Sequence, residues 1–219
     1  MLKIYGSSVS PNYNKVKLAL LEKGIEFEEI LQLPSQEESY LAKSPMGKIP
    51  VVEVDGQFLA DSSAILDYLE AAYPAAPLLP LDFFERGKCR EVMQIIDLYI
   101  AGTAAAARLT GAALFAEPIS DEAKQEAQAL IERGVKALAK LVKFTPFIMG
   151  PKFTQADCVA FPKLGFAGMV TTIVLRKNLI EVIPGAAEYL KYMLERPAVQ
   201  KIVADQHKAM EVLMASIKK

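Results

Sequence analysis

The fold is decided by the stretch GKIPVVEVDGQFLADSSAI, residues 47–65. Asp55-Gly56 lies between two short runs of strand-forming residues, and this dipeptide is the strongest short-range signal for a β-hairpin. Pro50 stands at the start of the first run, where a residue without a backbone N–H is tolerated. Asp61-Ser62 follows the second run and precedes an apolar segment, so it predicts a helix N-cap. The stretch therefore predicts a hairpin followed at once by a helix.

The residues around this stretch alternate between strand and helix patterns. We expect strands over residues 2–5 and 27–31, helices over 14–23 and 62–72, and a polar segment over 34–43. The first helix should stop at Gly24, since glycine readily forms a helix C-cap. The order of strand, helix, strand, hairpin and helix predicts a small α/β unit with a mixed sheet.

A change of pattern follows residues 74–80, where Pro74, Pro77 and Pro80 indicate a loop. Beyond it, apolar residues recur at helical spacing, and we expect helices over residues 83–107, 121–143, 154–174 and 186–217. The sequence predicts an α/β domain over 1–75, a linker over 76–81 and an all-helical bundle domain over 82–219.

Composition disfavours several classes of protein. The 219 residues carry a net charge of -1, with acidic and basic residues interspersed, so nothing indicates nucleic acid as a partner. Cys89, Cys158 and His207 are isolated, which predicts neither a metal site nor a disulfide framework. The start of the chain does not resemble a signal peptide, and no window approaches the roughly 18 uncharged apolar residues of a transmembrane helix. We expect a cytoplasmic protein without a membrane partner.

The segment Gly47–Val52 followed by Asp61–Ile65 resembles the glutathione-binding half of cytosolic glutathione transferases, of a serine-type, bacterial or plant-like class. Members of that family pair a thioredoxin-like N-terminal domain with a helical C-terminal domain. The resemblance covers nearly the whole chain. It implies glutathione as co-substrate, a hydrophobic small molecule as second substrate, no metal, and a homodimer acting in detoxification.

The resemblance also assigns roles in glutathione binding. It implies that Pro50 follows a cis peptide bond and that the backbone of Ile49 pairs with the cysteinyl part of the tripeptide. Ser62 would take the γ-glutamyl carboxylate, with Asp61 near the γ-glutamyl amino group, and Lys48 is a candidate for the glycyl carboxylate. Each residue also has a plainer interpretation. A proline starts many edge strands, Asp and Ser cap helices, and a lone lysine is commonly a solvated charge.

These transferases stabilise the thiolate of glutathione with a Tyr, Ser or Cys near the first strand. A free thiol has a pKa of about 8.5, and lowering it by about two units requires roughly 2.7 kcal/mol. One hydrogen bond to a charged group supplies about 1.5–3 kcal/mol, so a single hydroxyl is enough. Ser10 is the favoured hydroxyl, because it precedes Lys15-Val16 by the interval that serine classes show before an Arg-Val pair. Tyr5 is the alternative, and the absence of a cysteine here disfavours thiol transfer.

In the helical half, Thr154 and Asp157 form the pattern of a capping box, with Phe153 and Cys158 as its hydrophobic staple. The family likeness places the electrophile site in the region of Tyr99, Arg108 and Phe115, where small residues could equally serve close helix packing. The function that the sequence favours is conjugation of glutathione to hydrophobic electrophiles. Glutathione-dependent peroxide reduction or isomerisation, and non-catalytic binding of glutathione or another ligand, are the alternatives.

Overall fold

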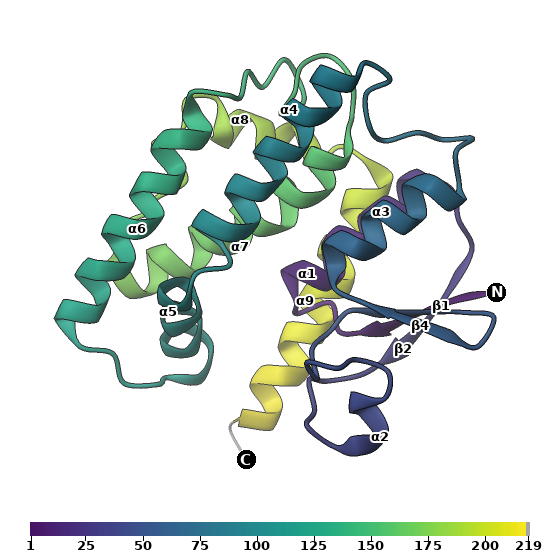
Figure 1. Cartoon of the computed structure of the whole chain (residues 1–219). Coiled ribbons are helices and arrows are strands. Elements are labelled where there is room, and N and C mark those ends of the chain that lie inside the picture. Colours follow the sequence, from purple (N-terminus) through teal and green to yellow (C-terminus); the bar gives the residue numbers. More distant parts are fainter. Residues whose placement is uncertain (218–219) are drawn as a thin grey trace. The chain divides into compact units, whose positions relative to one another are not determined.

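The computed structural model describes residues 1–217, which form two compact units. The first unit comprises Met1–Leu78 together with the segment that begins at Glu195, and the second comprises Leu79–Leu194. The domains predicted from the sequence, 1–75 and 82–219, were divided by type of secondary structure. The compact units are divided by which residues pack together. The last helix, α9 (Pro197–Ile217), thus belongs to the first unit, where it lies beside α1 (Pro11–Glu22) (Figure 1).

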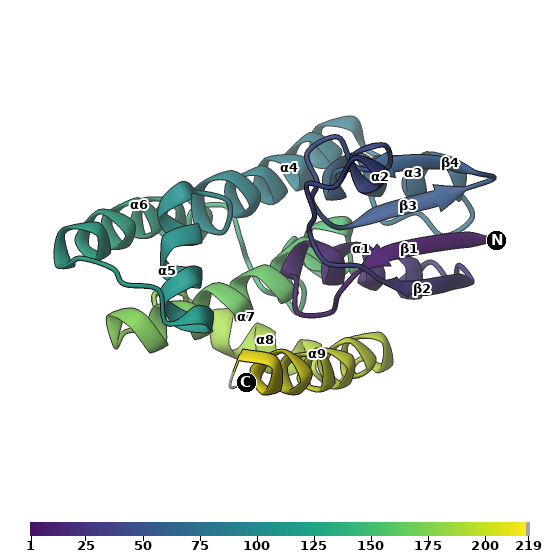
Figure 2. The same ribbon diagram turned by 90° about the horizontal axis from the view of Figure 1, so that it is seen from below.

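The first unit is built on the predicted mixed sheet. Its strands are β1 (Leu2–Gly6), β2 (Phe27–Leu31), β3 (Val51–Val54) and β4 (Gln57–Ala60). They lie in the order β2-β1-β3-β4, which can be followed from bottom to top in Figure 2. Strand β1 runs parallel to β2 and antiparallel to β3, and β3 and β4 form the hairpin. Asp55 and Gly56 in its turn both have positive φ, as a two-residue hairpin favours.

Successive residues of a strand point to opposite faces of the sheet. Ile4 and Val52 are paired in register, and both are almost fully buried. Helices α1 and α3 (Ser62–Ala72) lie side by side in the same unit (Figure 1). Tyr5 and Val51 form the next pair in register, and they pack with Tyr40 of α2 (Glu38–Leu41) in a second buried cluster.

Two details differ from the expected elements of this unit. Helix α1 begins at Pro11 rather than Asn14, because Ser10 caps it and proline is well suited to the first helical position. The polar segment 34–43 contains the single helical turn α2, which is too short to give a periodic pattern.

The named elements of the second unit are all helical, and one isolated β-bridge pairs Phe147 with Gly150. The unit contains α4 (Phe83–Gln94), the π-helical turn η1 (Ile95–Ile100), α5 (Ala104–Phe115), α6 (Asp121–Ala139), α7 (Gln155–Leu175) and α8 (Ala186–Met193). Helix α7 contacts all of the others, so it is the core helix of the unit. It is long and apolar enough to cross a membrane by length and composition alone. More than half of its apolar window is buried inside the protein, as is typical of a core helix.

Two of the expected helices are broken in the structure. Residues 83–107 do not form one helix, because the chain turns at Ala101–Thr103 between η1 and α5. Gly102 allows this turn, since a Cβ there would lie 2.0 Å from the carbonyl oxygen of Asp97. Residues 186–217 break before Pro197, which cannot continue a helix from the preceding turn. The predicted capping box of Thr154 and Asp157 is confirmed at the start of α7.

Candidate functional site

Three segments that carry the predicted glutathione-binding and catalytic residues lie at the same end of the sheet. Tyr5 is paired with Val51, so the loop after β1 lies near the residues that precede β3. Val51 is in turn paired with Ala60 on the antiparallel strand, so Pro50, just before Val51, and Asp61, just after Ala60, lie at the same end. The loop that leads to Ser10, the Ile49–Pro50 segment and the start of α3 therefore gather at one end of the sheet.

The N-terminus of α3 carries Asp61 and Ser62. The Asp61 carboxylate accepts hydrogen bonds from the backbone N–H groups of Ser63 and Ala64, at 2.8 and 3.1 Å. Asp61 itself has φ 74°, which is rare for a residue with a side chain. Within residues 1–217, neither the hydroxyl nor the backbone N–H of Ser62 has a protein partner. A free N–H and a free hydroxyl at a helix N-terminus can together accept a carboxylate.

The segment before β3 exposes its own backbone groups. The Ile49–Pro50 peptide bond is cis, as the resemblance implies. In the described part of the chain, the N–H and C=O of Ile49 make no hydrogen bond, and the side chain of Lys48 is exposed. This backbone can therefore pair with an extended peptide as an added strand would.

Ser10 is the N-cap of α1. Its Oγ accepts a hydrogen bond from the backbone N–H of Tyr13 at 3.3 Å. A serine hydroxyl accepts and donates at once, and no acceptor for its hydrogen is found among the described residues. The capping interaction therefore leaves Ser10 able to donate a hydrogen bond to a bound anion.

Tyr5 is placed differently. Its hydroxyl donates to the carboxylate of Glu53 on β3, and its ring lies in the buried cluster with Tyr40. The hydrogen bond to Glu53, together with burial, raises the pKa of Tyr5 to about 12. A phenol has only one hydrogen to donate, and that of Tyr5 is already engaged.

The electrophile-site candidates belong to the second unit. Tyr99 lies on η1 with half of its side chain exposed, and Phe115 at the end of α5 is similarly exposed. Arg108 on α5 pairs with the carboxylate of Glu126 on α6 at 2.6 Å. In the described structure no hydrogen bond or ring contact joins these three residues to one another.

Lys15, which stands where serine classes carry the arginine of the Arg-Val pair, is almost fully buried. Its Nζ lies 3.1 Å from Oγ of Ser63 in the first turn of α3. This contact ties α1 to the helix that carries Asp61 and Ser62. The sequence signal for its burial is its spacing of three and four residues from Leu18 and Ala19, which places Lys15 on the same face of α1 as these apolar residues.

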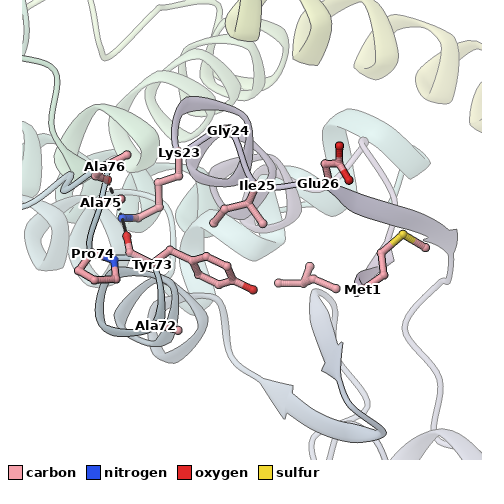
Figure 3. A pocket seen from close by; sticks show the side chains of 11 residues that line it. Met1, Lys23, Gly24, Ile25, Glu26, Ala72, Tyr73, Pro74, Ala75 and Ala76 are labelled. Carbon is pink, nitrogen blue, oxygen red and sulfur yellow. Dashed lines mark hydrogen bonds between the residues drawn. The ribbon is translucent and has the colours of Figure 1, made fainter.

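A pocket of about 630 Å³ opens elsewhere on the first unit. It is lined by the turn after α1 and the end of α3, including Ile25, Tyr73 and Pro74 (Figure 3). The ammonium of Lys23 lies at its wall and donates to the carbonyl oxygens of Tyr73 and Ala76. None of the sequence-predicted glutathione residues lines it. No group of three His, Cys, Asp or Glu side chains that could hold a metal ion occurs among residues 1–217.

Comparisons with known proteins identify the family of the chain. Residues 4–77 match the glutathione S-transferase N-terminal domain, and residues 121–191 match the glutathione S-transferase C-terminal domain. A glutathione S-transferase from Pseudomonas putida is 38% identical over 221 aligned residues, which cover 100% of this chain and 98% of that protein. A maleylacetoacetate isomerase from Dictyostelium discoideum is 34% identical over 68% of this chain and 69% of its own length.

Solved structures show the same fold at lower sequence identity. Glutathione transferase F2 from Populus trichocarpa superposes with a TM-score of 0.78 at 18% identity, covering 95% of this chain and 100% of that one. A maleyl pyruvate isomerase described as a bacterial zeta-class protein gives a TM-score of 0.72 at 21% identity, covering 91% and 95%. The thioredoxin-like unit with a helical partner unit thus defines the fold class. The chain belongs to the glutathione S-transferase family.

Proposed function

We propose that this protein conjugates the thiolate of glutathione to hydrophobic electrophiles. The observation that carries the proposal is the gathering of Ser10, Ile49 and Ser62, each with an unused hydrogen-bonding group, at one end of the sheet. The three unused groups match, by their chemistry, three parts of one tripeptide: a thiol, a cysteinyl backbone and a γ-glutamyl carboxylate.

The binding roles follow from the free groups. Ser62 donates its hydroxyl and backbone N–H to the γ-glutamyl carboxylate at the positive end of α3. Asp61 lies one residue away and offers a carboxylate to the γ-glutamyl ammonium. Ile49 pairs with the cysteinyl backbone, and the exposed Lys48 reaches the glycyl carboxylate.

The chemical step needs a sulfur anion at neutral pH. Ser10 donates its hydroxyl hydrogen to the sulfur, which favours the thiolate by about 1.5–3 kcal/mol and lowers the thiol pKa accordingly. The thiol proton leaves to solvent, and the sulfur lone pair then forms the C–S bond at the electrophilic carbon. A halide or similar group departs with the electron pair of its own bond. Tyr99, Arg108 and Phe115 are proposed to line the electrophile side.

Binding and turnover test this proposal separately. The protein should be retained on immobilised glutathione and eluted by free glutathione. It should also turn over at least one member of a panel of aryl halides, enals and isothiocyanates, in the presence of glutathione. Failure to bind the resin, together with no heat of binding in calorimetry, contradicts the glutathione site. Binding without turnover on any electrophile favours a ligand carrier instead.

Glutathione-dependent isomerisation is a second candidate, because the Dictyostelium relative that carries an isomerase name is 34% identical over two thirds of this chain. In that reaction the thiolate adds to an activated cis double bond and leaves after rotation, so the same Ser10 serves it. A cis-to-trans assay on a maleyl-type diacid distinguishes the two reactions. Glutathione would be regenerated there and consumed in conjugation.

We also infer that the protein acts as a cytoplasmic homodimer in detoxification, in keeping with its family. Light scattering of the purified protein measures the assembly. A mass near twice the 24.0 kDa of the chain is expected, and a monomer at micromolar concentration would exclude the dimer.

A further inference from the structure

Two buried hydroxyls converge on one backbone carbonyl beside the proposed glutathione site. The hydroxyl of Tyr40 donates to the carbonyl oxygen of Lys48 at 3.0 Å, and Oγ of Ser44 donates to the same oxygen at 2.8 Å. Ser44 also accepts a hydrogen bond from the N–H of Lys48 at 3.0 Å. We call this arrangement of Tyr40, Ser44 and the Lys48 backbone the Lys48 clamp.

The Lys48 clamp is part of the packed interior rather than a surface contact. Tyr40 is 5% exposed and Ser44 1% exposed. The ring of Tyr40 packs with Tyr5 and Val51, so its hydroxyl is held by the same cluster that covers one face of the sheet. Ser44 is fixed as well, because its carbonyl accepts the N–H of Gly47 at 2.7 Å in the intervening turn. Neither hydroxyl is free to leave Lys48 without disturbing this packing.

The carbonyl of Lys48 and the N–H of Ile49 belong to the same peptide group. Within the described chain, cis bonds occur before Pro50 and Pro146 only, so the Lys48–Ile49 bond is trans. In a planar trans peptide the C=O and N–H point in opposite directions. The two hydroxyls that hold the Lys48 oxygen therefore aim the N–H of Ile49 away from themselves, and this is the N–H that has no partner within the protein.

We propose that Tyr40 and Ser44 are positioning residues for glutathione, which orient the Ile49 N–H toward the cysteinyl carbonyl through the Lys48 peptide. This inference rests on the proposed glutathione site. Neither side chain touches the ligand, and each acts through a peptide plane whose rotation would misdirect the ligand-binding hydrogen bond. Tyr40 and Ser44 thus set affinity for the cysteinyl part of the co-substrate, independently of the thiol activator.

The test compares Tyr40→Phe, Ser44→Ala and the double variant with the wild type. Tyr40→Phe keeps the ring in its cluster and removes only one hydrogen bond to Lys48, so it is the least disturbing change. Calorimetry should show the glutathione Kd raised about threefold to tenfold in each single variant. In the double variant the Kd should rise by more than the product of the two single effects, because each single variant keeps one hydroxyl on the Lys48 carbonyl. The turnover number at saturating glutathione should change less than about twofold, because Ser10 is untouched.

Two controls separate positioning from general destabilisation. Tyr68→Phe on α3 removes a hydroxyl from the same unit outside the clamp and should leave Kd unchanged. Binding is measured at least about 20 °C below each melting temperature, where a loss of stability alone leaves Kd unaltered. γ-Glutamylcysteine, which lacks the glycine, should be weakened by the same factor as glutathione, because both ligands present the cysteinyl carbonyl.

The outcomes distinguish this inference from the proposed function. Wild-type protein that binds no glutathione overturns the site itself. Wild-type binding with an unchanged Kd in the double variant overturns the positioning role while leaving the site in place. A raised Kd for glutathione with an unchanged Kd for γ-glutamylcysteine also overturns it, because the clamp would then act on the glycyl contact of Lys48.

Discussion

Tyr5 on β1 and Glu53 on β3 are diagonal neighbours on one face of the antiparallel pair, and the phenol donates its hydrogen to the carboxylate. The same hydrogen bond raises the pKa of Tyr5 to about 12 and lowers the pKa of Glu53. Lys3 also contacts Glu53, at 3.4 Å. The hydroxyl of Tyr5 is therefore a structural group of the sheet rather than one available to the thiol of a bound ligand.

Replacing Tyr5 by Phe should leave conjugation nearly intact. We expect kcat/KM within about threefold of wild type, because the hydroxyl serves Glu53 and the ring stays in its cluster. Steady-state assays with an aryl halide measure this. A loss of about a hundredfold, with an unchanged fold by circular dichroism, would instead make Tyr5 the thiol activator.

Replacing Ser10 by Ala should lower kcat for the same electrophile at least about tenfold while changing glutathione Kd less than about twofold. The substitution also removes the cap of α1 and should cost about 0.5–2 kcal/mol of unfolding free energy. Spectroscopic titration of bound glutathione should show the thiol pKa rising toward about 8.5 in the variant.

Ser120→Ala is a matched control for this effect, because Ser120 caps α6 through the N–H of Ala123 at 3.2 Å. It should lower stability by a similar amount and leave kcat unchanged. Equal losses of activity in the Ser10 and Ser120 variants would mean that capping, not thiolate stabilisation, accounts for the Ser10 effect.

The buried carboxyl of Asp157 predicts a pH dependence of stability. Burial raises its pKa to about 6, although the hydrogen bonds that it accepts from the N–H groups of Ile148 and Thr154 act to lower it. The folded pKa lies above the unfolded one, so this stabilising contribution is complete below about pH 4 and is lost as the pH rises through about 6. Asp157→Asn removes the ionisation. Between pH 4 and 7 the unfolding free energy of the wild type should fall by roughly 2–3 kcal/mol relative to that of the variant. A constant difference over that range would contradict the raised pKa.

Lys163 and Asp97 form a buried ion pair inside the second unit, with Nζ and Oδ1 at 2.5 Å. Lys163→Met should cost about 3–5 kcal/mol in urea unfolding, because the carboxylate of Asp97 loses its buried cation. Adding Asp97→Leu should recover most of that loss, since an apolar pair is often no less stable than a buried ion pair. A double variant as unstable as the single one would show that Asp97 has a separate structural role.

Most of the fold was predictable because its signals are local. The hairpin followed from Asp55-Gly56, and the start of α7 followed from the spacing of Thr154 and Asp157. The break between η1 and α5 was missed, because alanine-rich residues around Gly102 favour a continuous helix. Thr103, whose Oγ1 caps α5 through the N–H of Ala106, was the available signal. The break before Pro197 was missed as well, because apolar residues recur at helical spacing on both sides of this proline.

The proposed site was predictable only in part. Ser10, Ile49 and Ser62 lie in motifs, whereas the roles of Tyr40 and Ser44 depend on contacts that the sequence does not encode locally. Tyr40 was a single aromatic residue in a polar segment, and its hydroxyl reaches Lys48 only after α2 has packed on the sheet. Hydrogen bonds that depend on such packing cannot be inferred from periodicity.

Helix α9 packs in the first unit although it is synthesised last, and this limits when that unit can complete its folding during translation. Lys17 is buried in α1 and contacts Glu29 and Asp205, each at 2.6 Å, and Arg196 pairs with Glu22 at 2.5 Å. Asp205 and Arg196 are made long after the rest of the first unit, with the whole second unit translated in between. At about 5–20 residues per second this interval lasts roughly 6–25 seconds. We therefore expect the first unit, whose synthesis begins first, to complete its packing only after the whole second unit has been synthesised.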